Sequence, residues 1–64
     1  MTIDRAKELL KTQIEFGSGY NRNAAKLILI EVQKEHGMAA FDRLVIEMDI
    51  ERHFGFHPGE ELHI

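Results

Sequence analysis

Residues 21–37, NRNAAKLILIEVQKEHG, carry a clear helical pattern from which the rest of the fold can be worked out. Apolar residues recur in it at three- and four-residue steps, which is the spacing of one helical face: Ala25, Ile28, Leu29 and Val32. Asn21 and Asn23 are of the residue type that caps the start of a helix, and Gly37 is of the type that ends one. The stretch therefore predicts a helix over residues 21–36.

The segments on either side of this stretch repeat its spacing. Residues 3–16 contain no glycine or proline, and their apolar side chains share one helical face: Ile3, Ala6, Leu10 and Ile14. After Gly37 the same pattern returns at Phe41, Leu44, Val45 and Met48. We therefore predict an all-α single domain, residues 1–64, with three helices and a short irregular C-terminal tail over residues 55–64. The helices are expected at approximately 3–16, 21–36 and 38–53.

Two alternatives to this interpretation remain open. Asp49 is able to cap a separate short helix over residues 50–54, in which case the third helix is kinked. Residues 27–32 and 44–50 are rich in β-branched and aliphatic side chains, which favour strands. Two isolated strands make a poor sheet, and neither run is bounded by turn residues. The helical prediction is therefore preferred over a mixed α+β fold.

Length, charge and cysteine content restrict the function. The chain has 64 residues, no cysteine and a net charge of −3 at pH 7. A ligand pocket of the usual size would consume most of so small a core, so we expect neither enzyme activity nor a cofactor. The acidic balance argues against nucleic acid as a partner. The longest apolar run, residues 27–30, is far too short to span a membrane, and no secretory signal is visible, so we expect a cytoplasmic protein.

The apolar surface exceeds what three packed helices require. The predicted helix 21–36 has a broad apolar arc and the predicted helix 38–53 has a second apolar line, and surplus of this kind marks an interface. The candidate interface consists of Leu27, Ile30, Ile46, Ile50 and Phe54. We predict a homodimer. In function, we expect a small interaction or regulatory module without catalytic activity, which self-associates, docks on a larger protein, or does both.

Three histidines near the C-terminus offer an alternative function, metal binding. His53 and His57 are four residues apart, a spacing that puts two imidazoles on one helical face, and His63 follows them. Imidazole nitrogens are suitable ligands for zinc or nickel. However, Gly55 lies between the first two histidines, and Pro58 disfavours a helical backbone at the residue before it. We therefore expect solvated histidines rather than a metal site.

Two further alternatives use basic residues. Glycines before a helix can bind an anion through free backbone N–H groups, and the candidate anion site consists of Gly17, Gly19, Arg22 and Lys26. The loop over residues 17–23 nevertheless lacks the established phosphate-binding motifs. A helix–turn–helix would allow an antitoxin-like DNA-binding dimer, provided that pairing gathers Arg22, Lys26 and Arg43 on one side. Acidic residues dominate the third segment, which disfavours this alternative.

Overall fold

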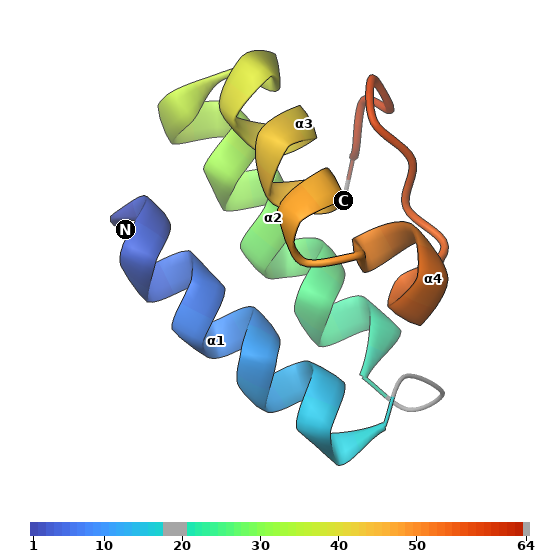
Figure 1. The fold of residues 1–64 in the computed structure, drawn as a ribbon. Helices are drawn as coiled ribbons and strands as arrows, with labels where there is room; N and C mark the ends of the chain where they lie inside the picture. Colours follow the sequence, from blue (N-terminus) through green and yellow to red (C-terminus); the bar gives the residue numbers. More distant parts are fainter. Residues whose placement is uncertain (18–20, 64) are drawn as a thin grey trace.

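The computed structural model describes residues 1–17 and 21–63, and its regular structure is entirely helical (Figure 1). The helices are α1 (Ile3–Phe16), α2 (Arg22–His36), α3 (Met38–Glu47) and α4 (Ile50–Phe54). No strand occurs in the described residues, which confirms the all-α prediction over the mixed α+β alternative. The first two helices lie where the sequence predicts them. The third is divided, and its second part has the bounds of the alternative short helix over residues 50–54.

Polar side chains at the helix starts differ in their roles. Thr2 Oγ1 accepts a hydrogen bond from the Arg5 N–H at 3.1 Å, which caps α1. Asn21, which was expected to cap α2, makes no such side-chain bond. Its Nδ2 instead donates to the Gln13 carbonyl of α1 at 3.1 Å. Asn21 therefore ties the start of α2 to the neighbouring helix.

A single residue, Gly37, connects α2 to α3. Its φ of 88° lies in the region that favours glycine, because a side chain is strained there. The Gly37 N–H donates to the Gln33 carbonyl at 3.0 Å, and the Gly37 carbonyl accepts from the Phe41 N–H at 3.2 Å. Both helix ends are thus hydrogen-bonded through the connecting residue. The chain reverses at this point, and α3 packs back against α2 (Figure 1).

The predicted third helix, 38–53, is corrected by the structure. α3 ends at Glu47, and Asp49 adopts a left-handed backbone with φ 55° and ψ 42° before α4 begins. In one unbroken helix Ile46, Ile50 and Phe54 would share a face turned away from the core. The break brings Ile50 and Phe54 inward, where they are 0% and 4% exposed, while Ile46 stays 70% exposed. Burying two large side chains contributes about 3 kcal/mol or more, which exceeds the cost of about 1–2 kcal/mol for one left-handed residue.

The core draws on all four helices and on the tail that follows them. It consists of Ala6, Leu10, Ala25, Leu29, Val32, Phe41, Leu44, Val45, Ile50, Phe54, Phe56 and Leu62. The tail is irregular, as the sequence predicts, but it is not detached from the fold. Phe56 is 1% exposed and Leu62 is 8% exposed, so the tail covers part of the core that the helices leave open.

Candidate functional site

α2 presents an apolar strip on the side that faces away from the core. Ala25, Leu29 and Val32 are fully buried, and on the opposite side of the helix Leu27 is 56% exposed. Beside it lies Ile30, which is half-buried and packs in part against the core. Two shallow surface hollows share these two aliphatic side chains. We call this surface the outer face of α2, and it consists of Asn23, Lys26, Leu27, Ile30, Glu31, Lys34 and Glu35.

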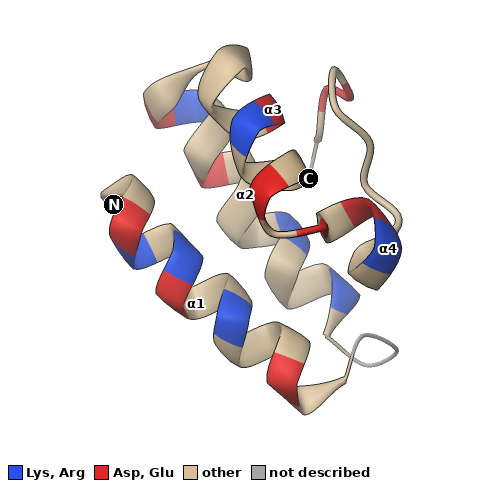
Figure 2. Ribbon diagram, viewed as in Figure 1, with Lys and Arg blue, Asp and Glu red and all other residues tan. Residues whose placement is uncertain are grey.

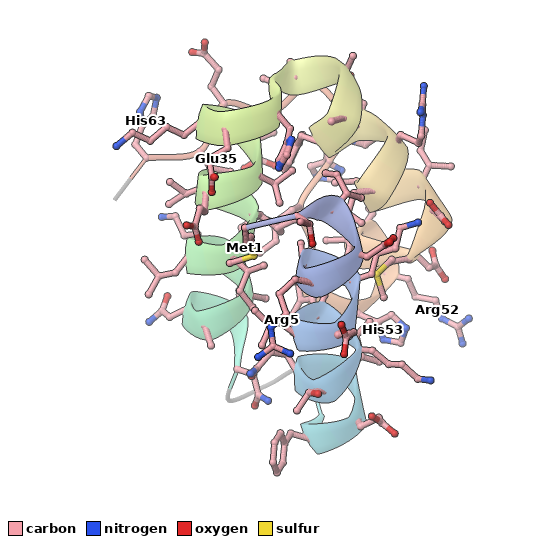
Figure 3. The ribbon with its side chains drawn as sticks, turned by 90° about the vertical axis from the view of Figure 1, so that its left-hand side faces the viewer. Met1, Arg5, Glu35, Arg52, His53 and His63 are labelled. Atoms are coloured by element: carbon pink, nitrogen blue, oxygen red, sulfur yellow. The ribbon has the colours of Figure 1, made fainter. Side chains whose placement is uncertain are left out.

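The two edges of the outer face differ in charge. Successive residues of an α-helix are about 100° apart, so Lys26 lies on one side of the apolar strip and Glu31 lies on the other. The acidic edge adjoins the start of α1. There the α-ammonium group of Met1 lies 3.8 Å from the carboxylate of Glu31 and 2.7 Å from that of Glu35 (Figure 3). The outer face is therefore an apolar strip between a basic edge and an acidic edge.

The contact between Met1 and Glu35 changes the pKa of both groups. The α-ammonium donates to Glu35 Oε1 at 2.7 Å and to Oε2 at 2.8 Å. This hydrogen bond raises the pKa of the α-amino group, against an opposing effect of desolvation, and the negative charges of Glu35 and Glu31 add to the increase. The same hydrogen bond lowers the pKa of the Glu35 carboxyl group. The start of the chain is thus held against α2 by a charged contact.

The five residues predicted to form an interface do not form one surface. Leu27 and Ile30 lie together on the outer face of α2. Ile46 is exposed on α3 and lines neither of the hollows that contain them. Ile50 and Phe54 lie in the core of the chain itself, so in this fold they offer no surface to a partner. Of the candidate interface, only the pair on α2 forms a continuous apolar strip.

The histidines of the metal-site alternative are spread over the C-terminal part of the chain. His53 is half-buried on α4, and His57 and His63 are exposed in the tail. The ring Nδ1 of His57 pairs with the Glu51 carboxylate, and Figure 3 shows His53 and His63 on opposite sides of the molecule. Among residues 1–17 and 21–63, no three His, Asp or Glu side chains lie close enough together to hold a metal ion. The geometry gives this alternative no support.

The residues of the anion-site alternative are not assembled around a common point. Gly19 lies outside the described residues, and Gly17 ends α1 with a φ of 100°. Arg22 is turned toward the end of the chain, because its Nε donates to the Phe54 carbonyl at 2.9 Å. Its guanidinium carbon lies 4.3 Å from the centroid of the Phe56 ring, a cation–π contact. Arg22 therefore helps to hold the tail.

The basic residues of the DNA-binding alternative lie on separate parts of the chain. Lys26 belongs to the outer face of α2, whereas Arg43 lines a different hollow, between α1 and α3. In that hollow Lys7 and Glu47 form an ion pair at 3.0 Å. Figure 2 shows Lys and Arg interspersed with Asp and Glu along α1 and α3. This distribution of charge gives the DNA-binding alternative no support.

Sequence reasoning missed a clasp that fixes the tail beside α2. The side-chain amide of Gln33 donates to the Glu60 carbonyl at 2.5 Å and accepts from the Leu62 N–H at 3.1 Å. Asp42 Oδ1 accepts a further hydrogen bond from the Gly59 N–H at 2.6 Å. The signal that could have revealed this clasp is Leu62, an aliphatic residue that follows a run of polar and turn residues, 57–61, and is buried against the core.

Comparison with known proteins does not supply a function. No protein-family model, curated protein or solved structure matches the chain. None of the helices in the described residues has the length and apolar character that crossing a membrane requires. A function must therefore be inferred from the surface itself.

Proposed function

We propose that this chain is a small interaction module without catalytic activity, which acts through the outer face of α2. The observation that carries the proposal is the exposed Leu27 beside Ile30, on a helix whose other side is closed by the core. Fully burying one such aliphatic side chain contributes about 1.5–3 kcal/mol. The occupant proposed first is a second copy of the chain, and a helix of a larger, regulated protein is the alternative occupant.

The closed interior supports a role without catalysis. The hollows found in the described residues are all open to solvent, so a ligand meets the chain there at its surface. Catalytic groups are commonly held in clefts that shift their pKa through burial and charge. Among the described residues, the two groups with shifted pKa are the Met1 amine and the Glu35 carboxyl, and they pair with each other in an exposed contact. Their arrangement is that of a structural ion pair.

The charges beside the strip favour a protein occupant. Lys26 and Glu31 flank the same two aliphatic side chains with opposite signs. A surface that binds nucleic acid would instead gather positive charge along one face. An apolar strip with a mixed polar border is the usual composition of a protein–protein interface.

Sedimentation equilibrium over a range of concentrations tests this proposal. We expect the wild-type chain to shift from monomer toward dimer as its concentration rises to about 1 mM, the range of weak association. Leu27→Asp places a charge in the apolar strip and should leave only the monomer. Ile46→Asp is the matched control, because it changes an exposed aliphatic residue on α3, and this variant should associate like the wild type.

Two results would contradict self-association through this face. One is a wild-type chain that stays monomeric up to about 1 mM. The other is a Leu27→Asp variant that dimerises as the wild type does. Circular dichroism of both aspartate variants serves as the check on folding, because neither position belongs to the core.

A further inference from the structure

We infer that two copies of the chain pair in parallel through the outer faces of α2, with Lys26 of each copy beside the partner's Glu31. The inference rests on the proposed function and adds to it the orientation of the pair and its polar contacts. Three properties of the outer face carry it: the spacing of its central residues, the charge of its edges and the small size of its apolar strip.

The spacing of the outer face is that of a coiled-coil seam. Its central line consists of Asn23, Leu27, Ile30 and Lys34, at steps of four, three and four residues. Side chains at these steps form one continuous line along a helix and interdigitate with the same line of a partner helix. The buried residues of α2 lie on the opposite side, so a partner approaches the line from solvent. A second α2 helix therefore packs along the whole line.

The charged edges distinguish a parallel pair from an antiparallel one. In a parallel two-fold pair, the residue that precedes one residue of the central line faces a residue of the partner helix. That partner residue follows the next residue of the central line, so its number is higher by five. Lys26 precedes Leu27, and Glu31 follows Ile30, so opposite charges meet. In an antiparallel two-fold pair each edge meets its own counterpart, and like charges meet instead. The distribution of charge therefore selects the parallel pair.

Both charged groups are available for this contact. None of the ion pairs found among the described residues involves Lys26. The side chain of Glu31 is 47% exposed, and its 3.8 Å ion pair with the Met1 α-ammonium is longer than the 2.7 Å contact that Glu35 makes with the same group. Exposed ion pairs contribute little to affinity, but here symmetry makes two of them, and complementary charge sets the orientation of a complex.

The small size of the apolar strip sets the strength of the pair. Only Leu27 and Ile30 supply apolar layers, and this area is well below that of a standard interface, so the dimer is weak. Lys34 lies on the same central line and meets its own counterpart across the two-fold axis. Replacing this repulsion with a third apolar layer, as in Lys34→Leu, should tighten the dimer about tenfold or more.

Charge reversal tests the predicted pairing. Lys26→Glu and Glu31→Lys each turn the two attractive contacts into repulsive ones, and each should raise the dimer Kd about tenfold. The double variant Lys26→Glu/Glu31→Lys restores opposite charges and should return the Kd to the wild-type value. In an antiparallel pair every one of these variants keeps like charges together. Single variants with an unchanged Kd, or a double variant as weak as the single ones, would overturn the parallel pair.

Disulfide cross-linking gives a direct readout of orientation, because the chain contains no cysteine of its own. A parallel pair places Asn23→Cys opposite its own counterpart, so this variant should oxidise to a covalent dimer about tenfold faster than Glu8→Cys on α1, an exposed control outside the outer face. Cross-linking of Asn23→Cys to Lys34→Cys, in preference to itself, would overturn the parallel pair and leave self-association intact. Equal rates for all variants, with a monomeric wild type, would overturn both.

Discussion

The two faces of α2 carry the same aliphatic residue types under opposite conditions. Leu29 on the inner face has no exposed surface, whereas Leu27, two positions earlier, keeps 56% of its surface in water. The inner face packs against apolar side chains from the other helices and from the tail, so the stabilisation from burying it is already part of the folded monomer. The outer face still has that stabilisation to gain. Residue type alone therefore does not separate a core face from a binding face, because the difference lies in what the rest of the chain brings against each.

The largest effect should come from truncating the inner leucine. Leu29→Ala leaves a cavity in the core and should lower the free energy of unfolding by about 2–5 kcal/mol. Leu27→Ala, the matched change on the outer face, should lower it by less than about 1 kcal/mol in the monomer. Urea denaturation at a low chain concentration compares the two. Similar losses for both variants would contradict the distinction between the faces.

A smaller effect is expected at Gln33, which holds the tail along one border of the outer face. Gln33→Ala removes the two hydrogen bonds that this side chain makes with the tail and should cost about 1–3 kcal/mol of unfolding free energy. The Leu62 N–H loses its acceptor, so its hydrogen exchange should become faster. Lys34→Ala, the adjacent exposed residue, is the control and should leave the exchange at Leu62 unchanged. An unaltered exchange rate in Gln33→Ala would show that the clasp does not hold the tail.

The break between α3 and α4 allows a test on the inner side, because it brings two residues into the core that α2 faces. Asp49→Val puts a β-branched side chain at a φ of 55° and should lower the free energy of unfolding by about 1–2 kcal/mol. Asp49→Gly relieves the strain, so its free energy of unfolding should exceed that of the Val variant by at least that amount. Thermal unfolding measures the difference. Equal melting temperatures for the two variants would mean that the left-handed turn is absent in solution.

The smallest effect is a pH dependence at the acidic edge of the outer face. The pKa of Glu35 is lowered from its ordinary 4.5, so its contribution to stability is present above that value and is lost as pH falls through the lowered pKa. The pKa of the Met1 amine is raised from 8.0, so its contribution is present below pH 8.0 and is lost as pH rises through the raised pKa. Glu35→Gln should flatten both limbs of a plot of melting temperature against pH. A plot that keeps its shape in this variant would assign the dependence to other groups.

Most of the fold could be predicted from the sequence, and the misses share a physical cause. Glycine placement and apolar spacing are local signals, so they located α1, α2 and the turn at Gly37. Ile46 and Ile50 look equivalent in the sequence, yet the first is 70% exposed and the second is fully buried. Their difference arises from a left-handed turn at Asp49 that only tertiary burial favours. The sequence offers a separate helix over residues 50–54 only as an alternative, because local pattern contains no record of the gain from burying Ile50 and Phe54.

The candidate site could be predicted only in part, because local spacing shows aliphatic residues but not the contacts that tertiary packing makes. Leu27 and Ile30 stand out as aliphatic residues outside the predicted stripe, and they do lie on the outer face of α2. Phe16, 74% exposed at the end of α1, was not singled out because it adjoins a helix end rather than a second stripe. The clasp at Gln33 joins residues 27 and 29 positions apart, and no sequence spacing announces such a contact.

Amide chemical shifts can show directly whether the chain associates through the outer face of α2. Spectra of the ¹⁵N-labelled chain at increasing concentration report which residues change surroundings on association. We expect concentration-dependent shifts centred on Leu27 and Ile30 and extending to Lys26 and Glu31, with the amide of Ile46 unchanged. Shifts centred on α3, or spectra that do not change with concentration, would contradict it.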